Sequence, residues 1–124
     1  MGIYIIKSIH SDWIKIGHHR ITKRRPSVYY RFINRGFYSV KCPEEIRDRV
    51  GGDDLKLIYW FENLDTIVER QIHKKLRLLF EYEGEWYRNE NISMILNIII
   101  NDFNGVLKLP DPNEIFGHKE TQDY

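Results

Sequence analysis

The first half of the chain alternates between short apolar runs and polar turns, a pattern typical of β-strands joined by hairpins. Residues 2–7 and 13–17 are rich in isoleucine and aromatic side chains, and a polar stretch separates them. They therefore predict the two strands of one hairpin. Residues 55–61 form a third aliphatic and aromatic run, which predicts a buried strand.

Apolar residues at helical spacing predict two long helices in the second half of the chain. Over residues 65–80 they recur every three or four positions, which predicts an amphipathic helix. A second such stripe begins after Asn91, which we expect to cap the helix, and ends at Gly105. A shorter helix is predicted over residues 43–50, because a proline and two glutamates begin it and two glycines end it.

Two further segments have local patterns of their own. Residues 26–35 fit a helix that begins with a proline and ends before Gly36, but residues 27–33 also fit a strand. Residues 85–87 predict a short strand after a turn at Gly84.

Together these elements predict an α/β fold: a small, mainly antiparallel sheet of three or slightly more strands, flanked by helices. The 124 residues suit one domain with one hydrophobic core. We expect this domain to span residues 1–109 and a polar, loosely held tail to span residues 110–124.

The composition is that of a soluble protein, with 42% hydrophobic and 30% charged residues. No apolar run reaches the roughly 18 residues that a membrane span requires, and no secretory signal pattern follows Met1. The single cysteine, Cys42, excludes an internal disulfide and a cysteine-rich zinc site. We therefore expect an intracellular protein, cytoplasmic or nuclear, that does not bind a membrane.

Positive charge is concentrated in one interval of the chain. The net charge is only +1, yet no acidic residue occurs between Asp12 and Glu44. The basic residues of this interval are Lys15, Arg20, Lys23, Arg24, Arg25, Arg31, Arg35 and Lys41, together with His18 and His19. Such a block favours a polyanionic partner, and we expect DNA, or RNA, bound through its phosphates. The alternative is a solvated loop whose charges have no specific partner.

Several short motifs occur in an order that resembles the GIY-YIG nuclease superfamily. They are Gly2-Ile3-Tyr4 and Lys15-Ile16-Gly17 in the two hairpin strands, then Arg31, then Glu69 followed by His73 in the long helix, and last Gly84-Glu85-Trp86-Tyr87. The chain is similar in particular to the phage and large-virus branch, in which Lys-Ile-Gly replaces Tyr-Ile-Gly. The resemblance covers about residues 2–87.

This resemblance implies a divalent-metal-dependent endonuclease that hydrolyses phosphodiester bonds in DNA. It implies that Tyr4 helps to activate the attacking water, that Arg31 holds the scissile phosphate and that Glu69 binds one Mg²⁺ or Mn²⁺ ion. The roles suit the reaction, because hydrolysis needs an activated nucleophile and neutralised phosphate oxygens. One carboxylate is a plausible anchor for Mg²⁺, which keeps several of its waters.

Lys15 departs from the superfamily pattern, because it stands where the second tyrosine is usual. An ammonium group can orient phosphate or water, but lysine with its ordinary pKa near 10 is a poor base at neutral pH. The general base would then be Tyr4 or a histidine such as His18, which titrates in the useful range.

The phosphate-binding role of Arg31 also has rivals, since the gap between Gly17 and Arg31 is long. Arg20 and Arg24 are the alternatives. The other residues expected at the substrate are Gly17, Lys23, Arg25, Arg35 and His73.

Each candidate also has a structural interpretation. Tyr4 could be an ordinary strand aromatic, and Glu69 could complete a capping box begun by Thr66. His73 could be a structural hydrogen-bonding residue. The Gly84-Glu-Trp-Tyr motif is expected to serve packing, with Gly84 permitting the turn and Glu85 exposed.

Two other functions are compatible with the same sequence. One is a nucleic-acid-binding module that keeps the fold and has lost catalysis, with Lys15 as the sign of that loss. The other is a protein-interaction domain that uses Tyr29, Tyr30 and Tyr38.

Overall fold

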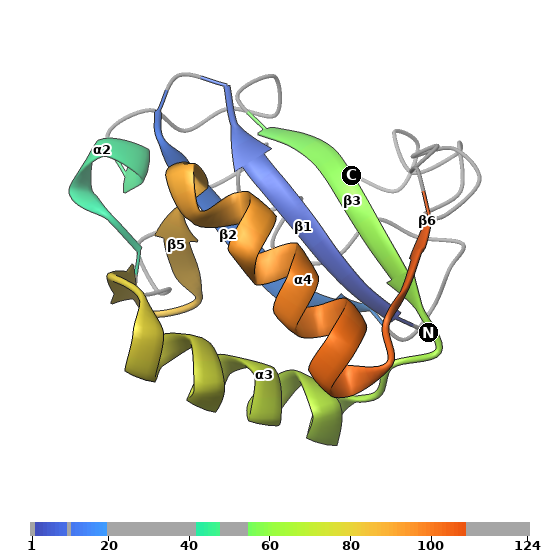
Figure 1. Cartoon of the computed structure of the whole chain (residues 1–124). Coiled ribbons are helices and arrows are strands. Elements are labelled where there is room, and N and C mark those ends of the chain that lie inside the picture. The colour runs from blue at the N-terminus through green and yellow to red at the C-terminus, as the bar shows by residue number, and fades with distance from the viewer. Residues whose placement is uncertain (1, 10, 20–41, 48–54, 109–124) are drawn as a thin grey trace, which may run out of the picture.

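A computed structural model describes residues 2–9, 11–19, 42–47 and 55–108. The strands are β1 (Gly2–Ser8), β2 (Trp13–His19), β3 (Leu55–Glu62), β4 (Tyr82–Glu83), β5 (Trp86–Arg88) and β6 (Val106–Lys108). The helical segments are α2 (Glu44–Arg47), α3 (Thr66–Leu79), the 3₁₀ turn η2 (Asn89–Asn91) and α4 (Ile92–Phe103). Strands and helices thus form an α/β fold, as the sequence predicts (Figure 1).

The strands form one six-stranded sheet in the order β4-β5-β2-β1-β3-β6, and every neighbouring pair is antiparallel. Three of the four strands that the sequence predicts, seen as β1, β2 and β3, lie at the centre of this sheet, and the fourth is seen as β5. In β1, Tyr4 faces Gly17 of β2 on one side and Trp60 of β3 on the other. The pairing of β5 with β2 covers only Trp13 to Lys15, so among the described residues no strand pairs with the rest of this edge of β2.

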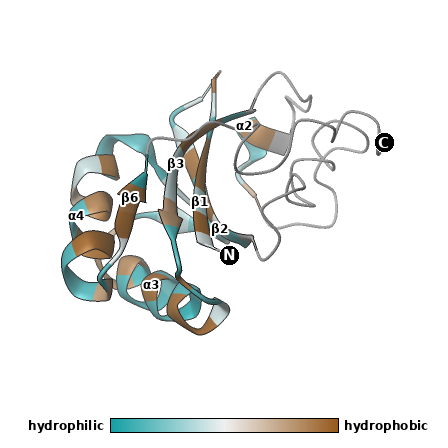
Figure 2. Cartoon of the chain, turned by 90° about the vertical axis from the view of Figure 1, so that its right-hand side faces the viewer, coloured by the Kyte–Doolittle hydropathy of each residue, from teal (hydrophilic) through white to brown (hydrophobic). Residues whose placement is uncertain are grey.

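The alternation of side chains along the strands builds a core on each face of the sheet. One face packs against α3 and α4 through Ile3, Ile5, Ile14, Ile16, Ile72, Leu76, Ile95 and Ile99. The other face carries Tyr4, Ile6, Trp13, Trp60 and Trp86, and Ile46 of α2 packs there. Figure 2 shows α3 and α4 on one side of the sheet and α2 on the other.

Helix α3 begins one residue later than predicted, and its cap is Asp65. The Asp65 carboxylate accepts a hydrogen bond from the Val68 backbone N–H at 2.9 Å. Thr66 is therefore the first helical residue, and the alternative of a capping box between Thr66 and Glu69 is wrong. The cap uses only the backbone N–H of Glu69, which bonds to the Asp65 carbonyl oxygen, so its carboxylate remains available for another role.

The ends of α4 differ from the prediction in two details. The side chain of Asn91 makes no capping hydrogen bond, because the 3₁₀ turn η2 leads directly into the helix. At the other end Asn104, with φ of 58°, takes the left-handed conformation expected of Gly105. Gly105 serves packing, since a Cβ there would lie 2.8 Å from Cγ2 of Ile99.

Other expectations are met only in part by the described residues. The left-handed φ of 60° at Gly84 confirms the predicted turn before β5. The helix predicted over residues 43–50 is seen as α2, but the segment 26–35 and the tail 110–124 lie outside the described residues. No helix in the described part of the chain combines the length and apolar character needed to cross a membrane.

Candidate active site

The candidate site begins where Tyr4 crosses Gly17. These residues face each other in the pairing of β1 with β2. A Cβ at position 17 would lie 2.2 Å from the Tyr4 hydroxyl oxygen and 2.3 Å from Cζ of its ring. Only glycine leaves room for this ring, so Gly17 is what allows the hydroxyl of Tyr4 to lie over strand β2.

Lys15 lies two residues before Gly17 on the same face of β2, and it is 4% exposed. Its Nζ donates hydrogen bonds to the Tyr4 hydroxyl at 3.3 Å and to Oε1 of Glu85 at 2.7 Å. Burial lowers the pKa of Lys15, but the attraction of Tyr4 and Glu85 outweighs burial and raises it overall. Lys15 is therefore an ammonium ion at neutral pH and cannot act as a base there.

Glu85 is the site residue that the sequence interpretation missed. Its side chain is 41% exposed and forms the ion pair with Lys15. Burial raises the pKa of Glu85, but the attraction of the Lys15 ammonium lowers it by more, so the pKa is lowered overall and the carboxylate stays ionised. The signal was present in the chain: a buried strand lysine requires a carboxylate partner. Glu85 precedes Trp86, which faces Lys15 in the sheet.

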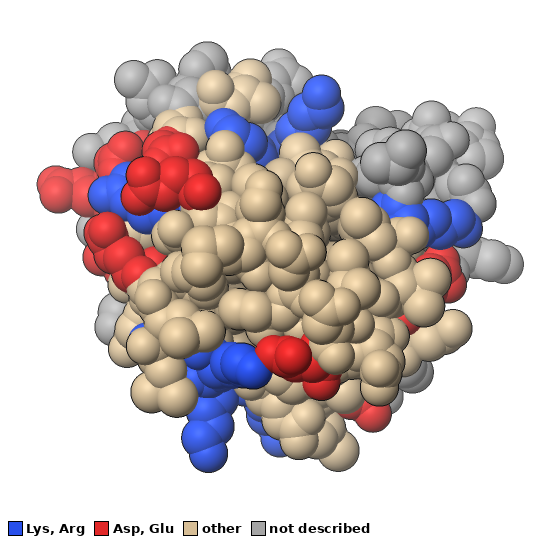
Figure 3. Space-filling view, in the orientation of Figure 1, with Lys and Arg blue, Asp and Glu red and all other residues tan. Residues whose placement is uncertain are grey.

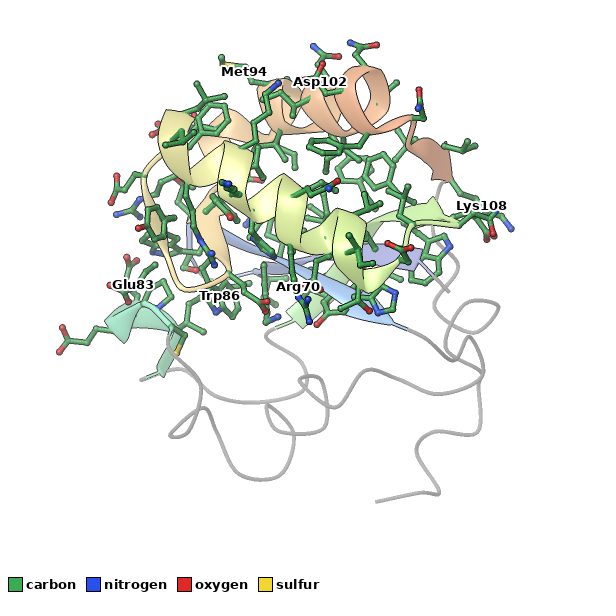
Figure 4. All side chains as sticks on the ribbon, turned by 90° about the horizontal axis from the view of Figure 1, so that it is seen from below. Arg70, Glu83, Trp86, Met94, Asp102 and Lys108 are labelled. Atoms are coloured by element: carbon green, nitrogen blue, oxygen red, sulfur yellow. The ribbon has the colours of Figure 1, made fainter. Side chains whose placement is uncertain are left out.

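Helix α3 supplies Glu69 and His73, which lie one helical turn apart and face the same point. Nε2 of His73 lies 3.4 Å from Oε2 of Glu69 and 3.7 Å from Oε2 of Glu85. The same nitrogen lies 3.1 Å from the Ile16 carbonyl oxygen, at the part of β2 that β5 does not cover. Figure 4 shows Arg70 of α3 and Trp86 of β5 on the side of α3 that faces away from α4.

Tyr87 of β5 holds the imidazole from its other side. Its hydroxyl lies 2.6 Å from Nδ1 of His73, and the two rings are stacked. Burial raises the pKa of Tyr87, so it remains a neutral phenol. His73 thus joins the helix to two strands through fixed hydrogen bonds, and its orientation in the site is set by Tyr87 and Ile16.

Tyr4 is 3% exposed in this arrangement. Burial raises the pKa of its hydroxyl, and the nearby Lys15 ammonium, which lowers it, does not overcome burial. Tyr4 is consequently a neutral phenol at neutral pH, with its oxygen accepting a hydrogen bond from Lys15.

One oxygen or nitrogen atom from each of Glu69, His73 and Glu85 lies within 4.8 Å of the corresponding atoms of the other two. Two carboxylates and an imidazole are a donor set that suits a divalent cation. The residues at this point therefore fit the metal that the sequence interpretation assigned to Glu69 alone.

The structure does not bring every predicted residue to this place. Alternation along β2 puts His18 on the face opposite Lys15 and Gly17, away from the Tyr4 ring, and among the described residues His18 is not one of those whose ligand atoms gather at Glu69. The other predicted residues lie outside the described part of the chain: Arg20, Lys23, Arg24, Arg25, Arg31 and Arg35.

Comparison of the chain with protein-family models, with curated proteins and with solved structures found no match.

Proposed function

We propose that the chain is an endonuclease of the GIY-YIG type that hydrolyses phosphodiester bonds in DNA with the help of a divalent metal ion. The observation that carries this proposal is the convergence of a phenol, an ammonium and a carboxylate at one edge of β2. Tyr4, Lys15 and Glu69 come from three separate elements. Lys15 bonds to Tyr4 and to Glu85, and His73 lies between the carboxylates of Glu85 and Glu69.

Lys15 has the role of stabilising negative charge. Its ammonium is held by Tyr4 and Glu85 in a buried place, where charge interactions are stronger than in water. A phosphate oxygen beside it would be stabilised most in the transition state, when its negative charge grows. A lysine thus replaces the usual tyrosine by offering a fixed charge instead of a hydroxyl.

Tyr4 has the role of positioning the attacking water. As a neutral phenol, Tyr4 would orient a water molecule by a hydrogen bond, while the Lys15 ammonium holds the phenol oxygen in place. Because burial raises the pKa of Tyr4 and Lys15 is an ammonium ion, neither is a base at neutral pH, and the role that we propose for Tyr4 is to position the water.

Glu69 is the proposed anchor of the metal, Mg²⁺ or Mn²⁺. Its carboxylate is not used by the helix cap, and His73 fixes its position at 3.4 Å. When bound, such an ion neutralises charge on phosphate oxygens and lowers the pKa of a coordinated water.

The distribution of charge supports nucleic acid as the substrate. The face seen in Figure 3, to which α4 contributes, is poor in charge over its middle, and Met94 and Ile100 of α4 are exposed. This face offers phosphate groups little attraction. We propose that the substrate binds away from this face, at the edge of β2 where Lys15 and Glu85 meet Glu69 and His73, with the acid-free interval after Asp12 supplying further cations.

A plasmid-nicking assay with Mg²⁺ and with Mn²⁺ tests the proposal. We expect the wild type to cut, and we expect chelation or Glu69→Ala to remove the activity. Tyr4→Phe should lower the rate by about a hundredfold, because it removes the hydroxyl that positions the water. Glu90→Ala, which removes an exposed carboxylate outside the site, should leave cutting unchanged. Nicking that survives Glu69→Ala would contradict the assignment.

The burial of Tyr4 favours one second candidate, a nucleic-acid-binding module without catalysis. That function predicts DNA binding that weakens with salt, and no cutting with any divalent ion. The same assay, combined with a binding measurement, separates the two functions.

A further inference from the structure

We propose that Glu69, His73 and Glu85 together form a three-ligand site for a divalent transition-metal ion such as Mn²⁺, and that Glu85 links this ion to Lys15. The inference rests on the proposed function and deepens it, because it names two ligands beyond Glu69 and the class of metal. It is drawn from the geometry of the cluster, from its charge and from the hydrogen bonds around His73.

The spacing of the donor atoms suits a single ion. Nε2 of His73 lies 3.4 Å from Oε2 of Glu69 and 3.7 Å from Oε2 of Glu85. Adjacent ligands of one ion, with bonds of about 2.1 Å, are about 3 Å apart in octahedral geometry. Small movements of the side chains would bring all three groups within bonding distance of one ion, and the 41% exposure of the Glu85 side chain leaves room for such a shift while Oε1 stays bonded to Lys15.

The charges of the cluster leave a place for a cation. Among the described residues that meet here, two are carboxylates, and one, Lys15, is an ammonium ion. That ammonium is bonded to Oε1 of Glu85, while the other oxygen of Glu85 faces His73 and Glu69. Two carboxylates aimed at one point repel each other unless a cation or a proton lies between them. The two carboxylates and the ammonium leave one net negative charge, and a divalent ion would change this to one net positive charge. A positively charged site would attract a phosphate group.

The surroundings of His73 suit a metal ligand. A ligating histidine usually donates its other ring N–H to a fixed acceptor, which orients the ring. The hydroxyl of Tyr87, 2.6 Å from Nδ1, can accept that proton and leave the lone pair of Nε2 for the ion. Without an ion, Nε2 carries the proton and donates to the Ile16 carbonyl oxygen at 3.1 Å, and Nδ1 accepts from the Tyr87 hydroxyl. Binding an ion would move the proton to Nδ1, reverse the bond with Tyr87 and replace the bond to Ile16.

The donor set selects the class of metal. Mg²⁺ binds oxygen ligands and keeps its waters, whereas an imidazole beside carboxylates suits Mn²⁺ and the later divalent ions of its row. Mn²⁺ should therefore bind more tightly than Mg²⁺. Glu85 would use Oε2 for the ion and Oε1 for Lys15, which would hold the ammonium next to the metal.

Direct Mn²⁺ binding to the full chain tests the inference without relying on activity. The free Mn²⁺ signal in electron paramagnetic resonance gives the affinity. We expect Glu85→Gln to weaken Mn²⁺ binding by about tenfold or more, and Glu83→Gln, a carboxylate of the same hairpin outside the cluster, to leave it unchanged. Equal affinity in the wild type and Glu85→Gln overturns the inference.

Pulsed measurements on the same samples test His73. An imidazole nitrogen bound to Mn²⁺ gives a ¹⁴N modulation, which we expect in the wild type and expect to vanish in His73→Gln. Its absence from the wild type overturns the role of His73 as a ligand. Should Mn²⁺ bind as expected while plasmid DNA stays intact, the three-ligand site stands and the proposed nuclease fails. Metal-dependent cutting with unchanged affinity in Glu85→Gln would instead support the nuclease and overturn the three-ligand site.

Discussion

At the scale of single residues, the tightest relation in the site is between Tyr4 and Gly17. The ring of Tyr4 occupies the volume that a side chain at position 17 would need. Glycine therefore controls the position of the phenol, and through it the hydrogen bond from Lys15 at 3.3 Å. The order of the motifs could predict that Tyr4 and Gly17 lie in the same site. It could not predict that the ring of Tyr4 fills the volume that a side chain at position 17 would occupy.

We expect Gly17→Ala to lower the free energy of unfolding by about 1–3 kcal/mol, because the methyl group must displace a buried ring. It should also abolish cutting. Urea unfolding measures the first effect and plasmid nicking the second. In a Tyr4→Ala background the same substitution should destabilise much less, since the ring is gone; an equal loss in both backgrounds would argue against this contact.

The ion pair of Lys15 and Glu85 predicts how stability depends on pH. The pKa of Glu85 is lowered from 4.5, so its contribution is complete above pH 4.5 and is lost as pH falls through the lowered value. The pKa of Lys15 is raised from 10.5, so its contribution is complete below pH 10.5 and is lost as pH rises through the raised value. Between these limits the pair is fully ionised.

The stability lost in Glu85→Gln should therefore be constant at intermediate pH and should shrink in strong acid and strong alkali. Urea unfolding of both proteins over a pH series measures this difference. A difference that stays the same from about pH 7 down to about pH 2 would mean that Glu85 does not stabilise the fold through its charge.

The limits of prediction at this scale are clear from Glu85 and Tyr87. Tyr4, Lys15 and Glu69 could be predicted because each belongs to a short motif of consecutive residues. Glu85 meets Lys15 across 70 positions of sequence, and only the pairing of β2 with β5 brings them together. Tyr87 similarly contacts His73 through the fold and not through a local pattern.

At the scale of elements, the start of α3 determines which of its carboxylates is available. Asp65 caps the helix, so Glu69 lies beyond the cap and faces His73. The sequence alone does not decide between Asp65 and Thr66 as the N-cap, because the two possible helix starts differ by one residue. Only a start capped by Thr66 would make Glu69 part of a capping box. The long helices and central strands could be predicted from periodicity, whereas β4 and β6 are too short to show one.

We expect Asp65→Ala to destabilise the protein by about 1 kcal/mol, because it removes the side-chain acceptor for the Val68 N–H. Thr66→Ala, one residue along, should change stability much less. Urea midpoints of the two variants give the comparison. A larger loss in Thr66→Ala than in Asp65→Ala would return the cap to Thr66 and restore the structural explanation of Glu69.

At the scale of the whole molecule, both faces of the sheet carry a buried core, and the candidate site lies at the edge of β2 where the two sides meet. One face carries the packed core beneath α3 and α4, and the other carries Tyr4 beside the tryptophans (Figure 2). The basic interval after Asp12 could be predicted from composition to attract a polyanion. Its arginines lie outside the described residues, so a contact between any of them and a phosphate stays a prediction.

This interval should make DNA binding depend strongly on salt. Replacing Arg24 and Arg25 by glutamine should weaken binding, and the slope of log affinity against log salt should fall by roughly one for each phosphate that the protein no longer neutralises. Fluorescence anisotropy with labelled DNA gives both quantities. As the control, replacing the exposed Lys56 and Lys74 in the same way keeps the change in net charge equal. If both pairs have the same effect, only net charge matters.

The bond between His73 and the Ile16 carbonyl oxygen has a consequence for how this protein can change over time. A helix side chain there bonds to a backbone group that β5 does not reach. A substitution that removes the imidazole would therefore expose a backbone carbonyl as well as alter chemistry, and amide exchange near Ile16 should quicken with it. Related chains without the proposed activity would still be under selection to keep this histidine, so its persistence would not by itself be a sign of activity.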